Sequence, residues 1–369
     1  MKQYRLVILI TVFWLAVALS IQPLASAQEG ALEEGEITSP ALADNLIGDP
    51  ATKPYVVYLP PSYETSNESY PVFYVLHGYG GNHLEQTYRI KSALDRMIAD
   101  GEVREMIGVF VDGSCKFIGS FYLSSQTIGD YESYIVRDLV NHIDANYRTI
   151  AHRDTRGITG FSMGGYGALH LALKYPEVFS VADAQAGAPS YDINDADWWL
   201  GECEKVALNA PKTWDDFQRL GLYPRVSWSY SAAVSPNPDR PPFFLDPPFE
   251  VLNGEAQFLP EVWKLHEDSD IVHGHLERYL EQPVKLKGVQ IVHGVLDGVV
   301  PVSQARSVDA AMTGLGMEHV YDEHEGGHTY IPEKALKFLS DRFFNIVSVR
   351  PNDRLATTWG RIRDVHLKS

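Results

Sequence analysis

The feature that most constrains this chain is a Gly-x-Ser-x-Gly pattern at residues 160–164, where it reads Gly160-Phe161-Ser162-Met163-Gly164. A strand-like segment leads into it, and the helix-like segment 165–173 follows. A strand, a tight turn and a helix in this order lift a serine hydroxyl off a sheet and direct the helix N-terminus at it. The pattern alone is only suggestive, because it arises by chance with a probability of roughly 0.1 in a chain of this length.

Strand-like and helix-like segments alternate over most of the sequence. This alternation predicts an α/β fold with a mostly parallel central sheet and helices on both faces. The polar, acidic stretch 28–40 is expected to be a loose lead-in. The expected strands are 54–60, 70–76, 106–111, the segment before Ser162, 179–184, 289–295 and 319–323, and the expected helices are 83–100, 131–146, 165–173, 302–315 and 331–346.

Residues 186–286 break this rhythm. Proline clusters at 236–242 and 246–248 exclude regular sheet there. We interpret the stretch as an inserted lid or cap region over the C-terminal edge of the sheet, where open α/β folds bind ligands. Its tryptophans either pack a small subdomain core or, for one or two of them, line a substrate pocket. They are Trp198, Trp199, Trp214, Trp228 and Trp263.

The first 27 residues have the pattern of a signal peptide. Lys2 and Arg5 precede the apolar run 6–21, and Ala25-Ser26-Ala27 is a typical cleavage site. The alternative is a membrane anchor, but the run is short for a span and the cleavage site follows it. We therefore expect a secreted or periplasmic protein with no stable membrane anchor after cleavage.

Charge and cysteine usage narrow the range of partners. The formal charge is −17, and it becomes −19 without Lys2 and Arg5, which argues against nucleic acid or anionic membrane as a partner. Cys115 and Cys203 either form one disulfide or are two buried free thiols. No Cys-x-x-Cys pair is present, and His273 with His275 is too weak a signal for a metal site, so we expect neither metal nor cofactor.

A serine nucleophile needs a base, and the base needs an orienting carboxylate. In this fold class the expected chain order is serine, acid, histidine, each at the C-terminal end of a strand. Asp297 follows the apolar strand 289–296, although an aspartate before a glycine is also an ordinary turn residue. His328 has two glycines before it and lies between the last strand and the last helix, whereas its rival His324 lacks glycine neighbours.

The tetrahedral intermediate of acyl transfer needs backbone N–H donors. One is expected from Met163, the residue after the serine. The other is expected from Tyr79 in the glycine-rich loop 77–81, which would otherwise be a plain strand-to-helix turn. His77 is expected to be structural rather than catalytic.

With these motifs in order, the chain resembles the esterase D-type family of α/β-hydrolases. That group includes feruloyl and acetyl-xylan esterases, S-formylglutathione hydrolases and mycobacterial mycolyltransferases. The resemblance covers roughly residues 45–347 and extends to segments 57–63, 74–81, 119–122, 131–134 with Asp138-Leu139, and 160–165. It implies a catalytic domain at 28–347 and a triad of Ser162, Asp297 and His328, with Tyr79 and Met163 as oxyanion donors. The basic tail 348–369 lies outside it.

The resemblance implies a secreted serine carboxylesterase that forms an acyl-enzyme, with a small-molecule or polysaccharide-linked ester as substrate. Feruloyl or acetyl esters of plant polysaccharide fit the export signal, whereas a cytosolic S-formylglutathione hydrolase does not. The alternatives are an acyltransferase of the mycolyltransferase type and a serine peptidase. A non-enzymatic binding module is a further alternative, against which the intact set of candidate residues argues.

Overall fold

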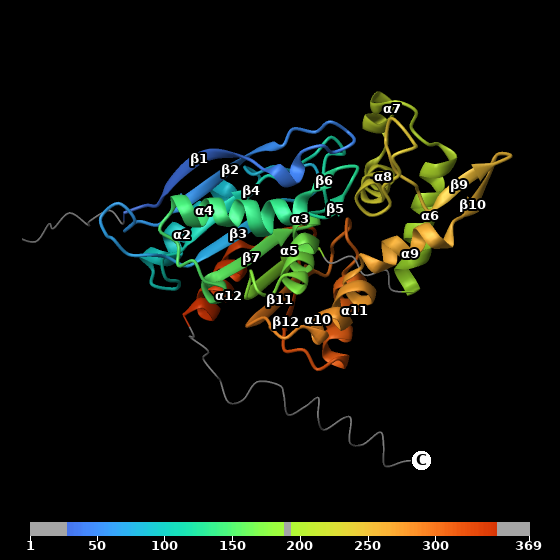
Figure 1. Cartoon of the computed structure of the whole chain (residues 1–369). Helices are drawn as coiled ribbons and strands as arrows, with labels where there is room; N and C mark the ends of the chain where they lie inside the picture. Colours follow the sequence, from blue (N-terminus) through green and yellow to red (C-terminus); the bar gives the residue numbers. More distant parts are fainter. Residues whose placement is uncertain (1–27, 188–192, 345–369) are drawn as a thin grey trace, which may run out of the picture.

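The computed structural model describes residues 28–187 and 193–344, and an eight-stranded sheet lies at its centre (Figure 1). The proposed signal peptide at 1–27 and tail at 348–369 lie outside the described residues. The strand order is β1-β2-β4-β3-β7-β8-β11-β12. The strands are β1 Ala31–Thr38, β2 Thr52–Leu59, β3 Val72–Leu76, β4 Ile107–Val111, β7 Arg156–Phe161, β8 Val181–Gln185, β11 Gly288–Gly294 and β12 Val320–His324.

The sheet is mostly parallel, as the alternation predicts. The six strands from β4 to β12 run parallel to their neighbours, whereas β1 pairs antiparallel with β2 and β2 pairs antiparallel with β4. All five residues of β3 and of β4 are buried, because helices cover both faces of the sheet. The α/β-hydrolase architecture expected from the sequence is confirmed.

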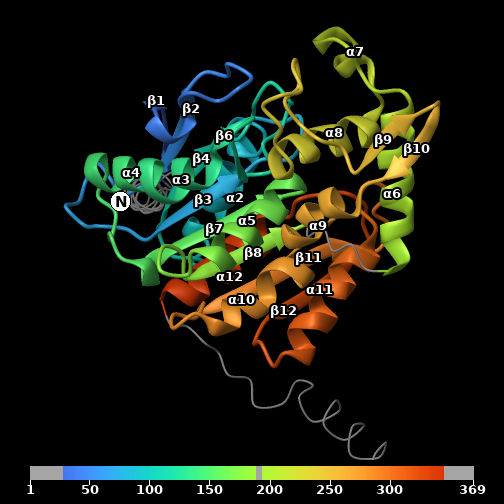
Figure 2. The same cartoon turned by 45° about the vertical axis from the view of Figure 1, so that its right-hand side comes forward.

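Helices pack on both faces, and each expected helix is present within a few residues. Helices α2 and α12 lie on one face of the sheet, and α3, α4, α5 and α11 lie on the other (Figure 2). An apolar cluster joins each set of helices to its face, and the cluster on the second face is the larger. The segment 131–146 is not one regular α-helix, because a π-helical segment, Tyr134–Leu139, interrupts it. The helices are α2 Thr87–Ala99, α3 Tyr131–Ser133, α4 Val140–Asn146, α5 Met163–Lys174, α11 Val302–Gly314 and α12 Pro332–Phe343.

The expected loose lead-in at 28–40 is wrong, because it contains the edge strand β1. Most of its side chains are exposed or half-buried, so no apolar alternation announces it. Its backbone nevertheless pairs with β2 over its full length, from Ala31 opposite Leu59 to Thr38 opposite Thr52. An edge strand of this kind forms through the backbone ladder and leaves charged side chains in solvent.

The described part of the inserted region 186–286 is mainly helical. Its helices α6 to α8 and the hairpin β9-β10 lie beyond one end of the sheet, whereas α10 lies beside the sheet near α11 (Figures 1 and 2). The two proline clusters lie outside regular strands, as expected, but a hairpin that the sequence analysis missed follows directly. Its turn residues Asn253 and Gly254 both have positive φ, which is typical of a type I′ turn. The elements are α6 Ile193–Leu208, α7 Trp214–Arg219, α8 Leu222–Val234, β9 Phe249–Leu252, β10 Glu255–Phe258, α9 Pro260–Asp268 and α10 Leu276–Glu281.

Both cysteines are free thiols, which decides between the two alternatives left open by the sequence. Cys115 lies in the loop after β4, and Cys203 is buried in α6. Within the two described ranges, no helix is long and apolar enough to cross a membrane.

Candidate active site

Ser162 lies at the sharp turn between β7 and α5. Its backbone angles, φ 56° and ψ −119°, fall in a region that non-glycine residues rarely adopt. The turn is held because the Ser162 N–H donates to the carbonyl of Gln185 at 2.9 Å. A Cβ on Gly160 would lie 2.1 Å from the carbonyl oxygen of Gly164, so only glycine fits there. This strained turn has the geometry of the nucleophile elbow that the Gly-x-Ser-x-Gly pattern predicts.

The structure brings Ser162, His328 and Asp297 together in one hydrogen-bonded line. His328 Nε2 lies 3.0 Å from Ser162 Oγ, and His328 Nδ1 lies 2.7 Å from Asp297 Oδ2. A carboxylate at Nδ1 fixes the tautomer with a proton on Nδ1 and leaves Nε2 free to accept from the hydroxyl. The arrangement can therefore take a proton from Ser162 and return it to a leaving group.

The Asp297 side chain is fully buried, and four donors surround it. Burial alone would raise the pKa of Asp297, but hydrogen bonds from His293 and His328 and from two backbone N–H groups hold it below its ordinary value. These N–H groups belong to Val299 and Val300, at 2.8 and 2.9 Å from Oδ1. Asp297 is thus ionised at neutral pH and can stabilise a positive charge on His328.

The two predicted N–H donors lie beside the serine. Tyr79 follows β3, Met163 begins α5, and both residues line the pocket that contains Ser162. No hydrogen bond from either N–H is found within residues 28–187 and 193–344. Both groups are therefore free to donate to a bound oxygen atom.

The pocket has a volume of about 340 Å³ and is mostly apolar. The sheet side contributes Phe121, Phe161 and Tyr166, and the inserted region contributes Trp199 and side chains from α8. The remaining residues of the lining are Gly78, Tyr79, Glu85, Ser162, Met163, Gly187, Leu222, Tyr223, Val226, Tyr230, Val299, Val300, Gln304 and His328.

The other described tryptophans lie elsewhere. Trp214 packs against Phe117, Phe217 and Phe243, and Trp263 stacks on His266. These contacts build the core of the inserted region, whereas Trp199 lines the pocket, so both interpretations of the tryptophans hold for different residues. The side chain of Trp198 lies outside the described part of the chain.

The sequence model of the family described as "Putative esterase" matches residues 52–244. This chain belongs to that family. "Esterase MT1326" from Mycobacterium tuberculosis (strain CDC 1551 / Oshkosh) is 36% identical over 246 residues, which is 60% of this chain and 52% of that protein. "Endo-1,4-beta-xylanase/feruloyl esterase" from Xylanibacter ruminicola is 33% identical over 129 residues, 33% of this chain and 18% of that protein. The chain spans about half the length of the Mycobacterium relative.

Solved structures show the same fold at low sequence identity. A "ferulic acid esterase" superposes with a TM-score of 0.53 at 20% identity, covering 85% of this chain and 99% of that one. An S-formylglutathione hydrolase from Agrobacterium tumefaciens gives a TM-score of 0.54 at 18% identity, covering 86% of this chain and 97% of that one. The predicted family and fold are therefore confirmed, and the predicted enzyme class, carboxylic ester hydrolase, is that of the named relatives.

Several residues around the site carry no signal in the sequence. His293 on β11 is fully buried, with Nε2 at 3.3 Å from Asp297 Oδ2 and 2.9 Å from the carbonyl oxygen of Val300. Beneath the elbow, Thr159 Oγ1 donates to buried Asp183 Oδ2 at 2.7 Å, and Gln185 Nε2 donates to the same oxygen at 3.0 Å. These groups support the turn at Ser162 from below.

His324, the rival for the base, makes no hydrogen bond to Ser162 or Asp297 among the described residues. Its Nδ1 accepts from the backbone N–H of Gly326 at 3.0 Å, within its own loop. Among residues 28–187 and 193–344, no group of three or more His, Cys, Asp or Glu side chains could hold a metal ion.

Proposed function

We propose that this protein is a serine carboxylesterase that works through an acyl-enzyme. The observation that carries the proposal is the hydrogen-bonded line from Asp297 through His328 to Ser162, with its 2.7 and 3.0 Å contacts at a strained elbow. Membership of the esterase family supports the same activity. The line opens into the apolar pocket, where an ester can lie.

In the first half of the reaction, Ser162 Oγ attacks the ester carbonyl while His328 Nε2 takes the hydroxyl proton. The carbonyl oxygen becomes an oxyanion, which accepts hydrogen bonds from the N–H groups of Tyr79 and Met163. The tetrahedral intermediate then collapses, and His328 returns the proton to the leaving alkoxide. An acyl group remains on Ser162.

In the second half, water enters where the alcohol left. His328 accepts a proton from the water as its oxygen attacks the acyl carbon, and the same N–H groups stabilise the second oxyanion. The Ser162 Oγ leaves with the proton from His328, and the carboxylic acid is released. Asp297 keeps the imidazole oriented and stabilises its charged form in both halves.

We propose an aryl or short aliphatic acyl ester as substrate. The pocket volume of about 340 Å³ and its aromatic lining suit a flat or short apolar group. The names of a relative with a feruloyl esterase part and of a ferulic acid esterase with the same fold support feruloyl or acetyl esters of plant polysaccharide. We further propose that the domain at 28–347 is exported by the segment at 1–27.

The replacement of Ser162 by alanine tests the proposal. S162A is expected to lower kcat on p-nitrophenyl acetate by more than about 10⁴-fold, because the remaining groups cannot form an acyl-enzyme. The exposed Ser69, changed to alanine, is the matched control, and circular dichroism checks that both variants fold. Wild-type turnover in folded S162A would contradict the mechanism. A screen of acetyl, butyryl and feruloyl esters, with and without an added alcohol acceptor, then identifies the acyl group and separates hydrolysis from transfer.

A further inference from the structure

Gly78 is the flexible point of the loop that presents the Tyr79 N–H. A glycine places few limits on its own φ and ψ, so the two peptide planes that flank it can rotate unless other groups hold them. The orientation of the Tyr79 N–H depends on the plane between Gly78 and Tyr79. The structure holds both flanking planes, and it does so from two different sides.

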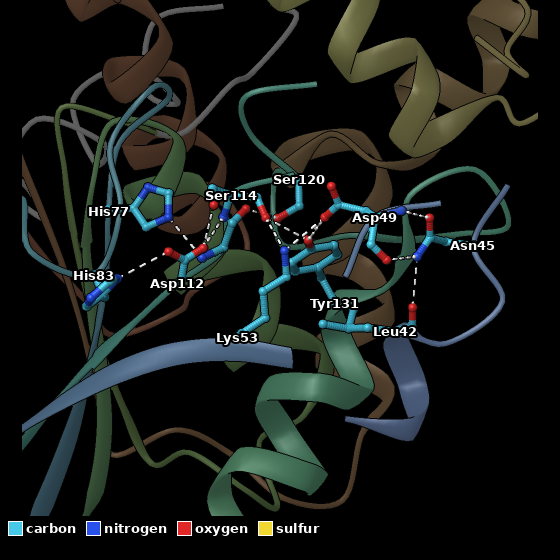
Figure 3. Close-up of polar contacts among 11 residues, drawn as sticks. Leu42, Asn45, Asp49, Lys53, His77, His83, Asp112, Ser114, Ser120 and Tyr131 are labelled. Atoms are coloured by element: carbon cyan, nitrogen blue, oxygen red, sulfur yellow. Dashed lines mark hydrogen bonds and ion pairs between the residues drawn. The ribbon is translucent and has the colours of Figure 1, made fainter. Parts of the chain in front are cut away.

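The plane after Gly78 is held through its carbonyl. The Gly78 oxygen accepts from the Gly81 N–H at 3.0 Å and from His77 Nδ1 at 2.7 Å. His77 is itself fixed, because its Nε2 accepts from the Gly113 N–H at 2.9 Å, beside Asp112 and Ser114 at the end of β4 (Figure 3). In a trans peptide the N–H points opposite to the carbonyl, so these bonds direct the Tyr79 N–H away from His77.

The plane before Gly78 is held at both of its polar groups by side chains from outside residues 77–81. Tyr122 Oη donates to the His77 carbonyl at 2.9 Å. The Gly78 N–H donates to Glu85 Oε2 at 2.7 Å, and Glu85 lies in the turn that precedes α2. The Glu85 N–H donates in turn to the carbonyl of Asn82 at 3.0 Å, which closes residues 78–85 into a compact loop. In the described part of the chain, no other acceptor for the Gly78 N–H is found.

Glu85 also lines the pocket, where it is the sole carboxylate, and Lys and Arg are absent from the described lining. A negative charge beside a developing oxyanion raises the energy of the transition state. The Glu85 carboxylate therefore raises the energy of the negative charge that develops on the substrate oxygen. Its value lies in its ability to accept the Gly78 N–H, which a neutral acceptor of the same shape can replace.

We propose that Glu85 is a positioning residue that holds the oxyanion loop in its productive form through the Gly78 N–H. The proposal rests on the proposed esterase function. Removal of the acceptor leaves the first peptide plane with the Tyr122 bond to the His77 carbonyl alone among the described contacts. The loop is then held less firmly, so that the Tyr79 N–H spends less time directed at the oxyanion. Ground-state binding is expected to change little, because Glu85 is one of many residues in the pocket lining and its hydrogen bond is made to the loop.

The test compares E85A with E85Q on p-nitrophenyl acetate, and E64A, which removes an exposed carboxylate in the loop between β2 and β3, is the control. We expect E85A to lose about 10- to 100-fold in kcat with KM within about threefold, less than the loss of a complete oxyanion donor. E85Q, whose amide oxygen can accept the same N–H, recovers most of kcat. Equal kcat for E85A and E64A would overturn the proposal, and so would an E85Q as slow as E85A.

A transition-state mimic gives an independent readout. Phenylboronic acid forms a tetrahedral adduct on a serine and carries its oxygen into the oxyanion position. Its inhibition constant is expected to rise in E85A by about the same factor as kcat/KM falls. An unchanged inhibition constant would overturn the proposal. Failure of the esterase function itself would instead appear as retained turnover in S162A.

Discussion

The sheet and the inserted region contribute to the same pocket in different ways. Ser162, Asp297 and His328 lie on loops at the carboxyl ends of parallel strands, where strand register fixes their separation. The inserted region supplies apolar walls, such as Trp199 and Tyr230, on helices that pack largely on one another. The comparison predicts that the chemistry depends on the sheet and that substrate choice depends on the inserted region.

The strongest test of the sheet's predicted contribution to catalysis is D297N. An asparagine amide cannot accept hydrogen bonds from His328 Nδ1 and from the buried backbone donors as a carboxylate does. His328 therefore loses the group that fixes its tautomer and stabilises its charged form. We expect kcat on p-nitrophenyl acetate to fall by about 10⁴-fold with the fold retained. D215N, which removes an exposed carboxylate from α7 in the inserted region, is expected to match wild type. A D297N loss of less than tenfold would mean that another group orients His328.

Much of the sheet and of the candidate site could be predicted, because short local signals specify them. The strand at 72–76, the elbow and the loop at 297 each carry their own apolar run and turn residues. Fixed chain order then gives Ser162, Asp297 and His328, which the structure brings within hydrogen-bond distance. Their catalytic role stays a prediction until it is tested.

The rest could not be predicted because it depends on which residues meet in three dimensions. Glu85 is an ordinary charged residue in sequence, and it gains significance only from the Gly78 N–H at 2.7 Å. Strand β1 has little apolar pattern, and its pairing with β2 is made by the backbone. The hairpin after the second proline cluster does carry a local signal, because Asn253-Gly254 is a typical hairpin turn.

A second test concerns the stability of the sheet. It uses Asp183 on β8, which is fully buried beneath the turn at Ser162. Burial raises the pKa of Asp183 to about 7, although hydrogen bonds from Thr159 and Gln185 oppose the shift. A carboxyl group with a raised pKa binds its proton more tightly in the folded state. Its contribution to stability is fully present below the unfolded pKa of about 4 and is lost as pH rises through about 7.

In D183N the side chain is uncharged at every pH, as in the protonated acid, so the loss of stability at high pH does not occur. We expect the free energy of unfolding of D183N, relative to wild type, to increase by about 2–4 kcal/mol between pH 4 and pH 8. Urea unfolding at a series of pH values measures it. If the unfolding free energies of wild type and D183N change in parallel with pH, the pH dependence of stability comes from another group. One such group is buried His266 in the inserted region, where burial lowers the pKa to about 3.

The inserted region's part is tested by W199A. Loss of this indole removes apolar wall from the pocket but leaves Ser162, His328 and Asp297 in place. We expect KM for methyl ferulate to rise about tenfold, in line with about 1–3 kcal/mol for a lost apolar contact. Activity on p-nitrophenyl acetate is expected to change less than about threefold, because an acetyl group reaches less of the pocket. Equal losses of activity on both substrates would mean that Trp199 supports the position of Ser162, His328 and Asp297. The proposed difference between the sheet and the inserted region would then be wrong.

The smallest expected effect concerns whether the two regions are joined covalently. Cys115 follows the sheet strand β4 and Cys203 lies in α6, so a disulfide between them would tie the inserted region to the sheet and contribute about 2–5 kcal/mol. Both are free thiols, and burial raises the pKa of each to about 12, which keeps them protonated and slow to oxidise. We therefore expect dithiothreitol to leave the unfolding midpoint unchanged, and thiol titration in denaturant to count both cysteines without prior reduction. A lower unfolding midpoint in dithiothreitol would show that a disulfide, as well as packing, holds the inserted region to the sheet. The pocket wall would then be held as rigidly as the hydrogen-bonded line of Ser162, His328 and Asp297.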